Sequence, residues 1–194
     1  MNIDAFIAKR VRDLRKARGY TLEELADSSG VSRSTISLIE RKETSPTAAV
    51  LGRLADALGV TLAALFSDEL QKSEQQPLAQ RSDQQVWTDP ASGYVRRHVS
   101  PRGFASPIEL VEVVFPPGKS VAFENVARSV VTHQQVWVLE GEMQVRVGEM
   151  TWQLKTGDCL AMVLDQHIGF RNAGRKPARY VVALTTLPST TGKS

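Results

Sequence analysis

The stretch that decides the fold of the first part of the chain is TLEELADSSGVSRSTISLIERKETSPT, residues 21–47. Thr21 is followed three residues later by Glu24, the pattern of a capping box that starts a helix. Ser32 can cap a second helix soon afterwards. Only residues 29–31 lie between the two expected helices. A turn this short needs a residue that accepts a left-handed backbone, and Gly30 occupies that position. The stretch therefore predicts two short helices that cross closely.

Charge and periodicity around this stretch agree with a nucleic-acid partner. The 194 residues include 24 lysines and arginines against 21 acidic residues, a formal charge of +3. Six of the basic residues fall within residues 9–18 beside a single acid, Asp13. Such clustering is typical of a phosphate-binding face. Up to residue 66 apolar residues recur at helical spacing, so we expect an all-helical unit, and an ordinary helical hairpin is the alternative to a DNA-binding one.

Residues 5–66 resemble the lambda repressor and Cro class of helix-turn-helix domains, the XRE family, and the run quoted above carries the resemblance. It implies an all-α unit of five helices, with Ser45-Pro46 beginning the fourth and Thr61 capping a short fifth. It also implies a transcriptional regulator that binds double-stranded operator DNA, and such regulators usually act as homodimers.

The family places the second helix of its motif in the major groove, so the residues expected to read bases lie in the first half of that helix. Arg33 can donate two parallel hydrogen bonds to guanine and is the main candidate. Ser34 and Ser37 can read base edges less selectively, and Leu38 completes the expected set.

Four further residues are expected to contact phosphates, because helix N-termini and flexible cations suit backbone contact. They are Thr21, Ser32, Arg41 and Lys42. For Arg41 and Lys42, a favourable charge at the helix C-terminus is an alternative compatible with this role.

The remaining basic residues before residue 20 have other expected roles. Arg15 and Glu40 resemble a family ion pair that ties the first helix to the recognition helix, so we interpret them as structural. Arg10, Arg12 and Lys16 either contact phosphate or form a solvated face.

The second part of the chain has a different pattern. Residues 67–85 are polar and glutamine-rich, which predicts a linker between separately folded units. Short β-branched runs separated by turn signals follow, which indicates an all-β sandwich or barrel, and the tail 189–194 is expected to fray. The expected strands are 94–100, 108–115, 130–139, 143–147, 151–154, 160–164 and 180–187.

Two segments of this part resemble the cupin family: HQQVWVLEGEMQV, residues 133–145, and LKTGDCLAMVLDQHIGFRN, residues 154–172. The resemblance implies a double-stranded β-helix barrel over residues 86–188 whose interior holds a metal or a small ligand.

The metal ligands of the family are missing at the matching positions. The glutamate position falls on Gln134, and the last histidine position falls on Ile168, one residue from His167. The paired histidine positions fall near Arg128 and Val130. No cofactor is therefore expected, although a bulge at His167 or substitution by His133 would restore a metal site. This lack also argues against an enzyme.

We instead expect the barrel to bind an organic effector in a pocket with apolar walls and a few polar anchors. Cys159 is either a redox-sensing thiol or, as we favour, a buried small residue. The expected pocket residues are Gln135, Trp137, Arg146, Trp152, Met162, Phe170 and Tyr180.

The sequence thus predicts a cytoplasmic, non-enzymatic regulator with a DNA-binding domain at 1–66 and a sensing and dimerisation domain at 86–188. One cysteine and no signal peptide or membrane span agree with that compartment. Two other function classes remain as alternatives: a cupin enzyme with an accessory DNA-binding domain, and a protein whose barrel binds a toxin or another protein partner.

Overall fold

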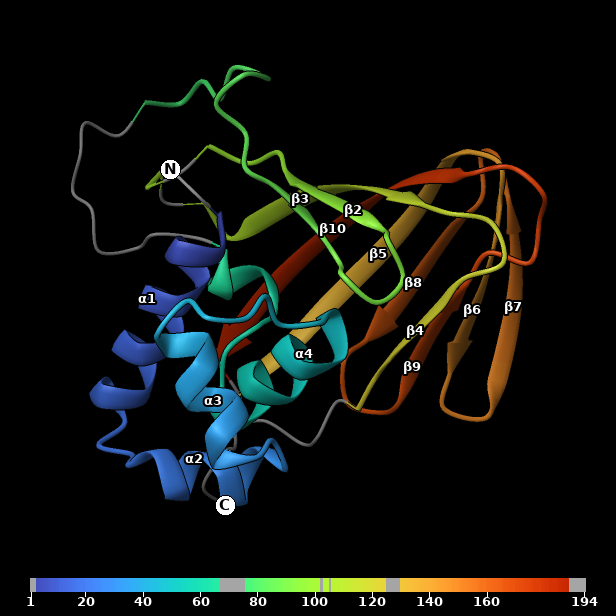
Figure 1. The fold of residues 1–194 in the computed structure, drawn as a ribbon. Helices are drawn as coiled ribbons and strands as arrows, with labels where there is room; N and C mark the ends of the chain where they lie inside the picture. The colour runs from blue at the N-terminus through green and yellow to red at the C-terminus, as the bar shows by residue number, and fades with distance from the viewer. Residues whose placement is uncertain (1–2, 67–75, 102, 105, 125–129, 189–194) are drawn as a thin grey trace, which may run out of the picture.

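The computed structural model describes residues 3–66, 76–101, 103–104, 106–124 and 130–188, and Figure 1 shows their arrangement. A helical part comes first and a β-rich part follows, as the sequence predicts. Residues 67–75 of the expected linker and the tail (189–194) lie outside the described residues. None of the helices within the described ranges is long and apolar enough to cross a membrane.

The described residues of the helical part form four α-helices and one 3-10 turn. The fourth helix begins later than expected, because Thr47 rather than Ser45 is its N-cap and accepts a hydrogen bond from the backbone nitrogen of Val50 at 3.3 Å. Thr61 caps the segment expected to form a fifth helix, but that segment closes as a single 3-10 turn. The elements are α1 Ile3–Ala17, α2 Leu22–Ser29, α3 Arg33–Glu40, α4 Ala48–Ala57 and η1 Ala63–Leu65.

Within the described ranges, the β-rich part contains ten strands in two antiparallel sheets. One sheet has the order β1-β2-β3-β10-β5-β8 and the other the order β4-β9-β6-β7. The seven expected strands are present, and β1, β4 and β9 are three additional short ones. The strands are β1 Val86–Thr88, β2 Val95–His98, β3 Ile108–Phe115, β4 Ser120–Phe123, β5 Val130–Glu140, β6 Glu142–Val147, β7 Met150–Lys155, β8 Cys159–Val163, β9 Ile168–Arg171 and β10 Ala178–Pro188.

Alternate side chains of the six-stranded sheet face the space between the sheets. In β5 the side chains of Val136 and Val138 are buried, whereas those at 135 and 137 are exposed. The register places Val182 of β10 opposite Val136 and Tyr180 opposite Val138, so the inner face continues across both strands. This inner face positions the pocket described below.

The helical and β-rich parts are packed against each other, a contact that the polar linker predicted from the sequence did not indicate. A single cluster of buried hydrophobic residues runs through both parts. Near the start of the β-rich part, Asp89 accepts a buried hydrogen bond at 2.8 Å from the backbone nitrogen of Ala48, the first residue of α4. The rings of Phe66 and Trp87 also meet across the junction, with centroids 5.5 Å apart. The polar linker concealed this packing because the contacts come from residues on either side of it.

Candidate DNA-binding surface and effector pocket

A tight turn joins α2 to α3 and sets the angle between them. At the start of α2, the backbone nitrogen of Thr21 donates to Glu24 Oε2 at 2.7 Å and Thr21 Oγ1 accepts from the backbone nitrogen of Glu24 at 3.2 Å. These bonds, the one from the Thr21 backbone first, lower the pKa of the Glu24 carboxyl. Gly30 ends α2 with φ at 64°, and Ser32 Oγ accepts from the backbone nitrogen of Thr35 at 3.1 Å to begin α3. The predicted capping box, glycine turn and second N-cap are therefore confirmed.

The first half of α3 is open to solvent, on the side of the helical part away from the sheets (Figure 1). Arg33 and Ser34 are exposed, while Ser37 and Leu38 are half-buried. Arg33 Nε lies 3.3 Å from Glu23 Oε2, but both side chains are about two-thirds exposed, 66% and 69%. An ion pair this exposed contributes little, so Arg33 is free to turn toward another acceptor.

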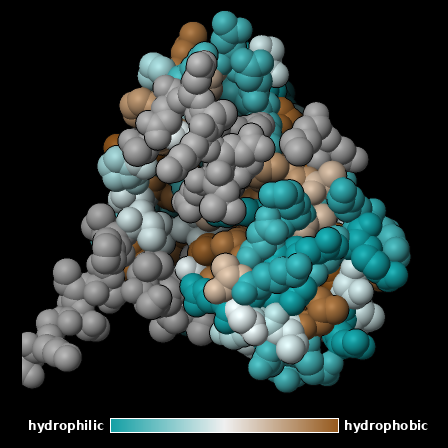
Figure 2. Space-filling model, turned by 90° about the vertical axis from the view of Figure 1, so that its left-hand side faces the viewer, coloured by the Kyte–Doolittle hydropathy of each residue, from teal (hydrophilic) through white to brown (hydrophobic). Residues whose placement is uncertain are grey.

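The residues expected at phosphates surround this surface. Thr21 and Ser32 are exposed at the N-termini of their helices, and Arg41 pairs with Glu43 at 3.3 Å beyond the end of α3. Lys42 is also exposed and adopts a left-handed backbone with φ at 66° to end the helix. Seen from the helical side in Figure 2, the coloured surface is mainly hydrophilic, as suits a face that meets water or nucleic acid.

A buried carboxylate ties α1 to the end of α3. Arg15 donates from Nε and Nη2 to the two oxygens of Glu40 at 2.7 and 2.9 Å, which raises the pKa of Arg15. This confirms the structural interpretation of the pair. Arg12 donates to the backbone oxygen of Glu40, and the buried Arg10 donates to a carbonyl of η1 at 3.1 Å. A solvated or phosphate-binding Arg10 is therefore excluded by its burial, whereas Lys16 is exposed.

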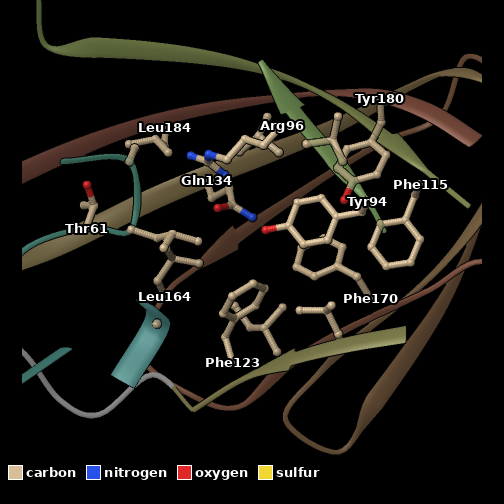
Figure 3. Close-up of a pocket in the computed structure, with 17 residues that line it drawn as sticks. Thr61, Tyr94, Arg96, Phe115, Phe123, Gln134, Leu164, Phe170, Tyr180 and Leu184 are labelled. Atoms are coloured by element: carbon tan, nitrogen blue, oxygen red, sulfur yellow. The ribbon is translucent and has the colours of Figure 1, made fainter. Parts of the chain in front are cut away.

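A pocket of about 70 Å³ lies between the two sheets at the end that the helical part covers (Figure 3). Its wall is mainly apolar, and both sheets contribute to it. The helical part contributes Gly52 of α4 and residues 61–63. A side chain at position 52 would meet Phe123 of β4, because a Cβ there would lie 2.9 Å from the ring. The pocket therefore touches both parts of the chain.

A few polar side chains lie in this apolar wall. Arg96 of β2 is only 7% exposed, and its side chain makes no hydrogen bond or ion pair with any residue that the structure describes. Its guanidinium lies over the ring of Phe66, 5.4 Å from the centroid. Burial lowers the pKa of Arg96, because removing a cation from water is costly, and the nearby carboxylate of Glu109 opposes this shift only in part. Among the described residues that line the pocket, Arg96 is the one with an ionised side chain.

Neutral polar groups surround the arginine. The Tyr94 hydroxyl points toward the amide of Gln134 (Figure 3). Burial raises the pKa of Tyr94 to about 12 and that of Tyr180 above its ordinary range. Both phenols are therefore neutral at physiological pH, and each can donate a hydrogen bond.

Three of the expected pocket residues lie inside the β-rich part. Phe170 and Tyr180 line the pocket, with their rings stacked at a centroid distance of 6.0 Å. Met162 is buried behind the wall, where its sulfur accepts from Gln134 Nε2 at 3.8 Å. The prediction of an interior position is confirmed for these three residues.

The same prediction is wrong for four others. Gln135 and Trp137 alternate with the buried residues of β5 and so point outward, leaving Trp137 51% exposed. Arg146 points outward from β6, and its Nε donates to a backbone oxygen at the next turn. Trp152 lies on β7, the edge strand of its sheet, and is 42% exposed. None of these four lines the pocket.

Sequence reasoning missed the pocket residues of β2 and of the helical part. The alternation of Tyr94, Arg96 and His98 along an expected strand was the available signal, because residues two apart share a face. For Gly52 and Thr61 the sequence held no such signal, since only the packing of α4 against β4 brings them to the pocket.

Two of the positions counted for metal ligands lie at the pocket, but their side chains do not fit a transition metal. Gln134 and Ile168 both line the pocket and supply one amide oxygen and no imidazole. His133 and His167 are exposed, and His98 is buried on β2. Arg128 lies outside the described residues. No group of three or more His, Cys, Asp or Glu suited to a metal ion occurs among the residues described.

Cys159 is exposed on the outer face of β8, where its sulfur lies 3.9 Å from Gln135 Oε1. The expectation of a buried small residue is wrong for this position, because it pairs in register with the outward-facing Trp137.

Comparison with known proteins agrees with the helix-turn-helix geometry. The sequence profile of the helix-turn-helix family matches residues 11–65. The control protein C.SmaI of Serratia marcescens is 36% identical over 75 residues, which cover 39% of this chain and 89% of that protein. The chain belongs to the helix-turn-helix family of transcriptional regulators. The regulator is also similar to SutR of Escherichia coli, 38% identical over 66 residues, which are 34% of this chain and 37% of SutR.

The matched stretches thus cover little more than a third of this regulator and of SutR. Over nearly its whole length the regulator is similar to a solved structure, an HTH_3 family transcriptional regulator from Vibrio cholerae. The two are 26% identical with a TM-score of 0.72, over 94% of this chain and 96% of that one.

Proposed function

We propose that this chain is a regulator that binds an operator sequence through α3 and changes its operator affinity when a small organic effector occupies the pocket. The observation that carries the proposal is the open first half of α3, presented by a tight turn at Gly30 and anchored by the Arg15–Glu40 pair. A helix presented in this way fits the major groove.

In this proposal Arg33 reads a guanine, and Ser34, Ser37 and Leu38 contact neighbouring base edges. Phosphate contacts from Thr21, Ser32, Arg41 and Lys42 set the register of the protein on the duplex.

We infer further that the β-rich part is a cupin-type double-stranded β-helix and that the chain has domains at 1–66 and 86–188. The strand orders support this inference, because β3-β10-β5-β8 facing β4-β9-β6-β7 is the arrangement of an eight-stranded jelly roll. The capped 3-10 turn η1 stands for the fifth helix of the helix-turn-helix unit.

The effector acts on DNA binding through the shared wall of the pocket. Gly52 belongs to α4, which contacts α2, and α2 contacts α3. A ligand that presses on α4 favours one orientation of the motif over another, and operator affinity changes by the ratio of ligand affinities for the two.

We also propose that the regulator is a homodimer paired through the outer face of the six-stranded sheet. Large apolar side chains are exposed on this face, among them Leu110 and Trp137. Arg179 pairs there with Glu112 at 3.2 Å and with Glu140. A face carrying both signs of charge beside apolar groups can pair with a two-fold copy of itself, and a two-fold protein matches two half-sites of an operator.

The test begins with an operator selected by the full-length protein from a pool of random duplexes, followed by fluorescence anisotropy over a salt series. Arg33→Ala is expected to weaken operator binding by about fivefold to 150-fold and to relax the preference at one base position. Arg41→Ala is expected to weaken all sequences alike and to reduce the salt slope by about one. Arg146→Ala removes the same charge from the far sheet and serves as the matched control.

An equal loss of operator affinity for Arg33→Ala and Arg146→Ala would show that net charge, and not the α3 surface, governs DNA binding. Sedimentation of wild type and Trp137→Glu tests the dimer, because a buried charge would dissociate it. An unchanged dimer in that variant would place the interface elsewhere.

A further inference from the structure

Arg96 is a buried cation that makes no hydrogen bond or ion pair with the residues that the structure describes. Its Nε is inaccessible to solvent and has no hydrogen-bond partner among the described residues. The electrostatic neighbours of its guanidinium are the phenols of Tyr94 and Tyr180 and the carboxylate of Glu109. Glu109 has interactions of its own and does not line the pocket. A charge kept in this state costs stability, and such groups concentrate at binding sites.

The residues around Arg96 indicate which kind of ligand would suit the pocket. The wall beyond the guanidinium is apolar and aromatic, with Phe123, Leu164 and Phe170 opposite it (Figure 3). The polar groups beside it, Tyr94 and Gln134, are neutral and able to donate. One end of the pocket therefore suits an anionic group and the other an apolar body.

We propose that the effector is a small organic monocarboxylate whose carboxylate pairs with Arg96 and whose apolar body fills the rest of the pocket. This inference rests on the proposed function and names the chemical class of its effector. Guanidinium binds carboxylate through two parallel hydrogen bonds, and the unused Nε is one of the donors this needs.

A single carboxylate fits the charge of the site better than a phosphate ester does. A phosphate group carries a charge of about −1.5 to −2 at neutral pH, whereas Arg96 is the one cation among the described residues that line the pocket. The cavity of about 70 Å³ also favours a small compound, since it holds several times the volume that one water molecule needs.

The experiment compares acids with their neutral amides. Butanoate, hexanoate, benzoate and phenylacetate, each beside the corresponding amide, are added at millimolar concentration to full-length protein, and thermal unfolding and calorimetric binding are measured. At least one acid is expected to raise the unfolding temperature, because a ligand that binds only the folded state stabilises it. Its amide, which has the same shape without the charge, is expected to bind at least about tenfold more weakly.

Variants separate a ligand site from a structural arginine. Arg96→Met is expected to abolish the preference for acid over amide without lowering the unfolding temperature of the ligand-free protein, because it removes a buried charge that has no hydrogen bond or ion pair among the described residues. Arg97→Met is the matched control, since Arg97 is the next residue of β2 and pairs with Glu112 at 3.4 Å on the other face. It is expected to keep the preference.

Amides that bind as well as their acids, acids that stabilise Arg96→Met as much as wild type, or no response to any acid would each overturn the inference. Operator binding is measured in parallel without ligand. Intact operator binding with no response to any acid rejects the carboxylate site but is still consistent with operator binding through α3. Acid binding that leaves operator affinity unchanged retains the site and rejects the proposed coupling.

Discussion

Replacing Arg15 by methionine is expected to destabilise the regulator strongly, because it leaves a buried carboxylate without its main partner. Glu40 is 6% exposed and receives two hydrogen bonds from Arg15, which is itself 12% exposed. Removing one member of a buried ion pair costs about 3–5 kcal/mol. Arg12 remains 3.6 Å from the carboxylate and is 43% exposed, so it compensates in part.

We therefore expect the free energy of unfolding to fall by about 3 kcal/mol, near the lower limit of this range. In a chain of this size that change lowers the unfolding temperature by about 6–12 °C. Denaturant unfolding and calorimetry of the full chain measure both quantities. The matched control is Lys9→Met, which breaks the exposed pair of Lys9 and Asp13 on the same helix. That change is expected to cost at most about 0.5 kcal/mol.

A double variant tests the cause. Arg15→Met combined with Glu40→Leu removes the stranded charge and is expected to recover most of the stability, since apolar replacement of a buried pair is often neutral. The reasoning fails if the double variant is no more stable than Arg15→Met, or if Arg15→Met costs no more than Lys9→Met.

Three other changes have expected outcomes. Lys42→Gly is expected to raise the free energy of unfolding by about 1 kcal/mol by relieving the left-handed backbone at φ 66°, and Lys42→Ala, which keeps that strain, should not. Asp89→Ala is expected to cost about 2 kcal/mol and to split one calorimetric transition into two, because it strands the buried backbone nitrogen at the start of α4; a single unshifted transition would contradict this. The lowered pKa of Glu24 means that its ionised form stabilises the fold at neutral pH, and that this contribution disappears as pH falls through the lowered pKa. Glu24→Gln should therefore lose part of the acid dependence of stability, unlike the exposed Glu149→Gln, and identical acid profiles for the two would refute the assignment.

The helix-turn-helix unit was predictable because its determinants are local. The Thr21 capping box, the left-handed Gly30 and the Ser32 cap each act within a few residues, so the sequence alone indicates them. The start of α4 was predicted wrongly because its determinant is not local. Ser45 and Thr47 can both cap a helix, and the buried contact from Asp89, far along the chain, favours the second.

The face of each strand was less predictable. In β5 apolar residues occupy both faces, with Val136 and Val138 inside and Trp137 outside, so hydrophobic alternation does not reveal which face is buried. Counting to the turn glycine put Gln134 at a ligand position of the cupin family, and this residue lines the pocket, whereas Gln135, the pocket residue predicted instead, is exposed. The contribution of Gly52 depends on tertiary packing alone and has no local signature.

The seam between the two parts has a consequence for how such genes can recombine. Asp89 supplies an acceptor to α4, and Phe123 occupies space that only a glycine at position 52 leaves open. A chimera that joins this helical part to a foreign barrel would lose that acceptor, and one that joins a foreign helical part to this barrel would clash unless it carried a glycine at the position of Gly52. The two parts therefore cannot be exchanged independently between related regulators. A lineage that exchanges one part must also keep or regain the matching contact residues on the other part.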